Sequence, residues 1–89
     1  MQQSTNNWKN QKTDELMDAI LLLEAKDEAL AFFRDLLTES EIIEFANRWK
    51  AARMLYNKEP YKKIEQQTGL SSTTIARVSK WLQKGMRGY

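Results

Sequence analysis

The segment YKKIEQQTGLSSTTIARVSKWL, residues 61–82, has the pattern of two short helices joined by a tight turn. Gly69 stands in the turn, where it is expected to end the first helix as a residue able to take a positive φ. We also expect a side chain at this position to clash. Apolar side chains stand at the positions that hold such a pair of helices together, namely Ile64, Leu70, Ile75 and Val78. This spacing predicts a helix-turn-helix at about residues 60–84.

The exposed side of the second helix carries small polar and basic residues. Its start is rich in hydroxyl side chains, and such a helix end can enter the major groove of DNA and approach bases and phosphates. Arg77 is the strongest candidate, because a guanidinium can bind guanine with two hydrogen bonds or clamp a phosphate. The residues that we expect to bind double-stranded DNA are Lys62, Lys63, Ser71, Ser72, Thr73, Thr74, Ala76, Arg77 and Lys80.

The same pattern also fits a second function. Two helices joined by a glycine turn occur in many proteins that never bind DNA, and Ser71 suits the N-cap of a helix without any ligand. The alternative is therefore a helix-turn-helix module for protein interaction, without specific DNA binding. Duplex binding that weakens steeply with salt would distinguish the two functions, since each phosphate contact releases counterions.

The charges are unevenly divided along the chain, although the net charge of its 89 residues is only +2. Residues 1–44 carry four basic and ten acidic side chains, a net charge of −6. Residues 45–89 carry ten basic and two acidic side chains, a net charge of +8. A basic C-terminal half is typical of proteins that bind a polyanion, but scattered, solvated lysines would give the same total.

The rest of the chain is predicted to be helical. Residues 1–12 are polar and are expected to form a flexible or disordered tail, and residues 13–89 to form a single all-helical domain. Thr13 is predicted to cap the first helix. A second helix is expected over about residues 27–37, where large apolar side chains recur at helical spacing.

A capping box formed by Thr38 and Glu41 predicts the start of a long third helix that ends near residue 57. The apolar band expected on this helix consists of Ile42, Phe45, Ala46, Trp49, Ala52, Leu55 and Tyr56, with Ile43 and Met54 beside it. The apolar faces of the first three helices are wide for so short a chain. We therefore expect a second subunit to cover part of them.

Cysteine and histidine are both absent from the chain. Disulfides, Cys/His zinc sites and the catalytic groups that use cysteine or histidine are therefore excluded, and we expect neither a metal nor an enzymatic activity. The N-terminus lacks the apolar stretch of a signal peptide, and no apolar run is long enough to cross a membrane. We therefore expect a cytoplasmic protein with no membrane partner.

From Leu36 to Leu82 the sequence resembles the Trp repressor family, and more closely its YerC/YecD-like branch. The resemblance is carried by LT at 37–38, Arg48, ARML at 52–55, YKKIE at 61–65, TG at 68–69 and TTIARV at 73–78. It implies an all-α fold, an intertwined helical dimer with a C-terminal helix-turn-helix head. It also implies transcriptional repression, with the two heads of a homodimer reading a palindromic operator.

The same resemblance implies a ligand site. In the tryptophan-binding member of the family, the residues that hold tryptophan correspond to Thr38, Arg48 and Arg77. That member has glycine where this chain has Val78, and a branched side chain there is expected to crowd an indole. We therefore expect no cofactor, and tryptophan in particular is disfavoured as a corepressor. Arg48 also suits an ion pair with Glu44, one helical turn before it.

Overall fold

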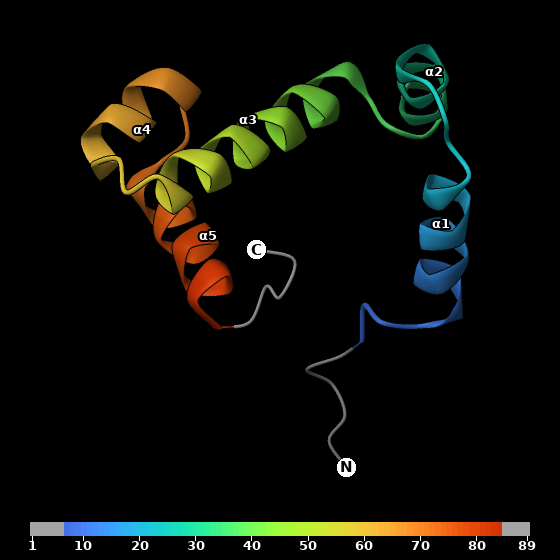
Figure 1. Cartoon of the computed structure of the whole chain (residues 1–89), viewed down its shortest axis with the longest axis horizontal. Helices are drawn as coiled ribbons and strands as arrows, with labels where there is room; N and C mark the ends of the chain where they lie inside the picture. The colour runs from blue at the N-terminus through green and yellow to red at the C-terminus, as the bar shows by residue number, and fades with distance from the viewer. Residues whose placement is uncertain (1–6, 85–89) are drawn as a thin grey trace. The chain divides into compact units, whose positions relative to one another are not determined.

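The computed structural model describes residues 7–84, and helices are the only regular elements within that range. The all-α fold class is therefore confirmed (Figure 1). In chain order the helices are α1 (Gln11–Leu21), α2 (Lys26–Leu36), α3 (Glu39–Tyr56), α4 (Tyr61–Thr68) and α5 (Ser72–Lys84). The predicted limits of the second and third helices agree with these bounds to within about one residue, and the predicted helix-turn-helix at about residues 60–84 corresponds to α4 and α5. None of the described helices is long and apolar enough to cross a membrane.

The chain divides after Leu37 into two compact units. We call Met1–Leu37, with α1 and α2, the N-terminal unit, and Thr38–Tyr89, with α3 to α5, the C-terminal unit. This division does not test the expectation of a single domain over residues 13–89, which stays a prediction.

The N-terminal unit starts its first helix earlier than predicted. The side chain of Asn10, and not that of Thr13, caps α1, and Asn10 Oδ1 accepts a hydrogen bond from the Thr13 backbone N–H at 3.0 Å. The reason is that Asn10 has extended backbone and its short amide reaches a free N–H of the first turn. Residues 11 and 12 are thus helical, while the part of the expected tail at 1–6 lies outside the described residues.

The N-terminal unit has no buried residue in α1 or α2. Leu21 is 81% exposed and Leu30 is 62% exposed, although both are strongly apolar. Phe32 and Phe33 meet edge to face with ring centroids 5.3 Å apart, a favourable geometry for two aromatic rings. The unit's apolar faces therefore lack a core of their own within one chain.

The C-terminal unit begins with the predicted capping box. Thr38 Oγ1 accepts from the Glu41 N–H at 3.1 Å, and Glu41 Oε1 accepts from the Thr38 N–H at 2.9 Å. This reciprocal pair satisfies two backbone donors and sets the first residue of α3.

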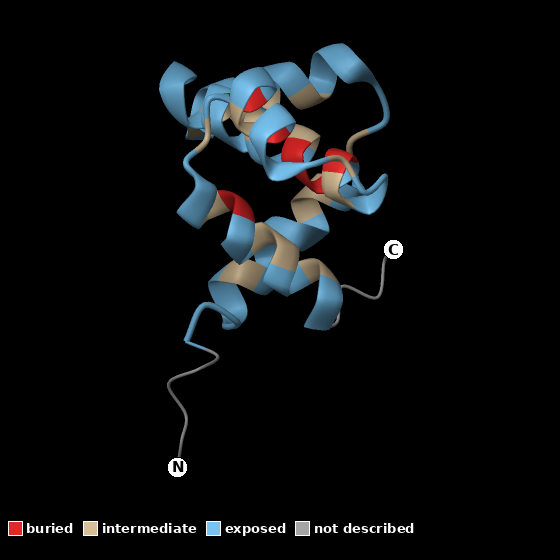
Figure 2. Cartoon of the chain, turned by 90° about the vertical axis from the view of Figure 1, so that its left-hand side faces the viewer, coloured by how far each residue is buried: buried red, intermediate tan, exposed pale blue. Residues whose placement is uncertain are grey.

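The core of the C-terminal unit lies where α3, α4 and α5 meet, as the red segments in Figure 2 show. Ile64 of α4 and Ile75 of α5 are both fully buried. The α3 residues of this core are Ala51 and Met54, with Leu55 and Leu70 packed against it.

The apolar band predicted on α3 is only partly correct. Ala52 is buried and Leu55 is half-buried, but the aromatic members Phe45, Trp49 and Tyr56 are exposed. The helix is apolar around much of its circumference. Its small side chains and Met54 face α4 and α5, which leaves the large rings on another side.

Candidate nucleic-acid interface

The predicted helix-turn-helix is formed by α4, a short turn and α5. Gly69 caps the C-terminus of α4 with φ of 74°, in the left-handed region that favours glycine. The expected clash is wrong, however, because a Cβ added at Gly69 would meet no atom within 4 Å. Glycine is needed in this turn for its backbone conformation and not for lack of space.

Thr68 has a role in this turn that the sequence pattern did not reveal. It is buried, and its hydroxyl donates to the Ile64 carbonyl at 2.7 Å and accepts from the Leu70 N–H at 3.2 Å. One hydroxyl therefore holds the end of α4 to the first residues after it. The signal available in the sequence was a threonine directly before a C-cap glycine, where a hydroxyl can back-bond along the helix.

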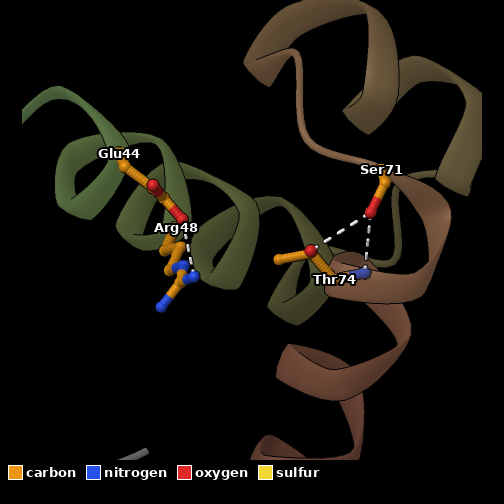
Figure 3. A network of polar contacts seen from close by, with 4 residues as sticks. All are labelled: Glu44, Arg48, Ser71 and Thr74. Carbon is orange, nitrogen blue, oxygen red and sulfur yellow. Dashed lines mark hydrogen bonds and ion pairs between the residues drawn. The ribbon is translucent and has the colours of Figure 1, made fainter. Parts of the chain in front are cut away.

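The start of α5 is capped by Ser71, as predicted. Ser71 Oγ accepts from the Thr74 N–H at 3.2 Å, and the two hydroxyl oxygens lie 3.1 Å apart (Figure 3). Ser71 and Thr74 were both expected to bind DNA. The structure engages both hydroxyls in the cap, and Thr74 is also half-buried.

The remaining predicted residues of α5 share one exposed face. Helical spacing brings Ser72, Thr73, Ala76, Arg77 and Lys80 to the same side, and all five are exposed. Ile75 anchors the other side of the helix in the core, and Val78 is half-buried. The cap and the buried anchor therefore fix a helix end that offers hydroxyls, two methyl groups and a guanidinium to solvent.

The two lysines predicted on α4 differ in their surroundings. Lys62 is exposed, and no ion pair is found for it among residues 7–84. Lys63 Nζ lies 3.1 Å from Glu59 Oε1, one turn earlier in the chain. The charge of Lys63 is therefore partly neutralised by its own chain, whereas Lys62 adds an available cation to the unit.

The ligand residues implied by the family resemblance are engaged locally. The Thr38 hydroxyl belongs to the capping box, and Arg48 Nη2 lies 2.6 Å from Glu44 Oε2 (Figure 3). Both partners of this ion pair are about half exposed. Arg77 lies on the exposed face of α5, and within residues 7–84 no hydrogen bond joins Thr38, Arg48 and Arg77 to one another. Among residues 7–84, no group of acidic side chains could hold a metal ion.

Similarity to known proteins extends along almost the whole chain. Residues 11–89 match the family model for the Trp repressor protein. The chain is 41% identical over 81 residues to the uncharacterized protein YerC of Bacillus subtilis, covering 91% of this chain and 78% of YerC.

Solved structures are similar as well. The crystal structure of a TrpR-like protein from Eubacterium eligens aligns with a TM-score of 0.85 and 40% identity, covering 94% of this chain and 87% of that chain. A second crystal structure, from Staphylococcus aureus, aligns with a TM-score of 0.81 and 39% identity, covering 94% and 84%. The similarity therefore includes the helices before the helix-turn-helix as well as the motif itself.

Proposed function

The chain belongs to the Trp repressor protein family, a family of helix-turn-helix DNA-binding regulators, and on that premise we propose that it represses transcription by binding a palindromic operator as a homodimer. The observation that carries this proposal is the exposed, polar and basic start of α5. This helix end is held rigidly by the Ser71 cap and by Ile75 in the core. A recognition helix needs both properties, because hydrogen bonds to bases tolerate distance errors of only about a few tenths of an ångström.

Within this proposal, Arg77 reads a base and the lysines bind phosphates. The guanidinium has the two-pronged geometry that fits guanine in the major groove. Thr73 and Ala76, on the same exposed face, offer methyl groups that suit the methyl group of thymine. Lys62 and Lys80 supply the sequence-independent attraction that orients the protein on the duplex.

The homodimer is proposed from the uncovered apolar surface. Leu21, Leu22 and Leu30 of the N-terminal unit are all more than half exposed, as are Phe45 and Trp49 of α3. Such a set of apolar side chains exceeds what a monomeric soluble chain normally leaves in water. A second copy of the chain is the partner that the family relationship favours, and it would place two α5 helices on one palindrome.

Binding of tryptophan is not part of the proposed function. Thr38 and Arg48 already make hydrogen bonds with Glu41 and Glu44, and Val78 adds a branched side chain at the position of the family's glycine. We expect calorimetric titration with L-tryptophan to give no heat of binding below millimolar concentration. Micromolar binding would overturn this part of the proposal.

The test is a selection of bound duplexes from a random pool, followed by titration at two salt concentrations. We expect a palindrome with half-sites about one helical turn apart, and an affinity that falls steeply with salt. Arg77→Ala is expected to weaken binding by roughly 1–3 kcal/mol of binding free energy in each half-site, and to relax sequence selection at one base pair. Arg77→Lys is the matched control, since it keeps the charge but loses the planar fork.

Two results would contradict the proposal. Unchanged affinity and specificity in Arg77→Ala would remove the assigned role of that residue. Absence of salt-dependent duplex binding by the wild-type protein would favour the alternative function, a helix-turn-helix module for protein interaction.

A further inference from the structure

Lys58, in the turn between α3 and α4, has an unusual backbone conformation. Its φ is 63°, and among residues 7–84 it is the only residue other than glycine with a positive φ. Side chains with a Cβ are disfavoured in this region, and a lysine is found there much less readily than glycine or asparagine. The turn therefore keeps a lysine where another residue would fit the backbone better.

The hydrogen bonds of the turn show which conformation Lys58 must adopt. The Glu59 N–H donates to the Met54 carbonyl at 3.0 Å, and the Lys58 N–H donates to the Leu55 carbonyl at 2.9 Å. These two bonds form a Schellman motif at the end of α3, with Lys58 at the left-handed position that is most often glycine. The conformation is thus set by the turn, and the side chain of Lys58 is not required to form it.

The position of the turn relates Lys58 to the proposed DNA interface. Met54, four residues earlier, and Ile75, in the first turn of α5, belong to the same buried core. The turn that follows α3 and the start of α5 are therefore held around one small cluster of side chains. Phosphates flank the major groove that a recognition helix enters, and the first helix of the motif crosses the backbone beside it.

Lys58 is also available to bind an anion. Its side chain is exposed. Among the described residues, Glu59 pairs with Lys63, and Lys58 takes part in no ion pair. That pair neutralises the single acidic side chain next to Lys58. The turn and the first residues of α4 are left with the charges of Lys58 and Lys62.

We propose that the Lys58 ammonium group binds a DNA phosphate at the edge of the groove entered by α5. This inference rests on the proposed function, and it adds a contact outside the helix-turn-helix that the sequence pattern did not single out. A phosphate contact strengthens binding to every sequence alike, because it carries no base information. It explains why a cation occupies a backbone position that favours glycine: unfavourable local conformation is retained where the side chain contributes to function.

The test compares Lys58→Asn and Lys58→Gly with the wild-type protein in two measurements. Both replacements suit the left-handed conformation and remove the charge. We expect the melting temperature of both variants to be equal to or above that of the wild type. If glycine removes all of the backbone strain at this position, the rise is about 4–8 °C. We expect duplex affinity to fall, with the salt slope reduced by about 1 for each lysine lost, or about 2 in a symmetric dimer.

Three controls separate the charge from other effects. Lys58→Arg keeps a cation at the same position and is expected to retain the wild-type salt slope. Lys26→Gln removes one charge from the N-terminal unit and is also expected to retain it. The ratio of affinities for the selected palindrome and for a random duplex is expected to be the same in every variant, since a phosphate contact does not discriminate between bases.

Each contrary outcome has a distinct meaning. A wild-type salt slope in Lys58→Asn and Lys58→Gly would overturn the phosphate contact. A lower melting temperature with an unchanged slope would also overturn it, and would indicate that Lys58 stabilises the C-terminus of α3 through the helix dipole. If the wild-type protein itself bound no duplex, the proposed function would fail, and the role of Lys58 with it.

Discussion

Replacing Ile75 by alanine tests the packing on which the proposed recognition helix depends. Ile75 is fully buried in a core with only a few other buried side chains, including Met54 and Ile64. An isoleucine-to-alanine change in a buried site costs about 2–5 kcal/mol, from lost transfer free energy and from the cavity that remains. A chain of 89 residues has a total stability of about 4–13 kcal/mol. The variant is therefore expected to lose a large fraction of its stability.

The assay is urea unfolding followed by far-ultraviolet circular dichroism, at one fixed protein concentration because an oligomer's stability depends on it. The midpoint is expected to fall by roughly 1–3 M with little change in the slope of the transition. Ile75→Val is the graded control, with an expected cost of about 0.5–1.5 kcal/mol. Gln66→Ala, at an exposed site on α4, is expected to change stability by less than about 0.5 kcal/mol.

A loss of less than about 0.5 kcal/mol in Ile75→Ala would refute this reasoning, because that value is typical of surface positions. It would mean that α5 is not anchored through Ile75. The rigid presentation of the exposed face of α5 would then have no physical basis.

Three further predictions concern local features. Thr38→Ala is expected to cost about 1 kcal/mol because the capping box is lost, while Glu41→Gln, which keeps the side-chain acceptor, is expected to cost less in the same urea assay. Gly69→Ala is expected to lower the free energy of unfolding by about 1–2 kcal/mol because of the positive φ alone, and Gly69→Val by more. A loss above about 4 kcal/mol in Gly69→Ala would indicate that a side chain at this position does clash. Arg48→Ala is expected to cost less than about 0.5 kcal/mol, since its pair with Glu44 is solvent-exposed, and a larger thermal destabilisation would assign the pair a structural role.

Much of the local structure was predictable from short stretches of sequence. The capping box of Thr38 and Glu41, the Ser71 cap and the left-handed Gly69 were all predicted and are all present. Each depends on residues three or four positions apart, so neighbouring side chains and backbone groups are sufficient to determine it. The ion pair between Arg48 and Glu44 follows the same one-turn spacing.

Two of the errors in prediction concern single residues at helix ends. Asn10 and Thr13 are both acceptable caps, and the sequence alone does not show which of two overlapping starts the helix takes. Whether a side chain at Gly69 would clash depends on the space around the turn, which the sequence does not show. In the structure that space is open.

The sequence by itself determined the helical composition of this chain, most of its helix ends and the segregation of basic charge into its second half. Only the tertiary structure decided which side of α3 is buried, because an apolar surface wider than one stripe can pack in more than one direction. It is the positions of α4 and α5 that place Met54 in the core and leave Trp49 exposed. The positive φ of Lys58 likewise emerged only in three dimensions, because the backbone hydrogen bonds of the Schellman turn indicate it and the residue type does not.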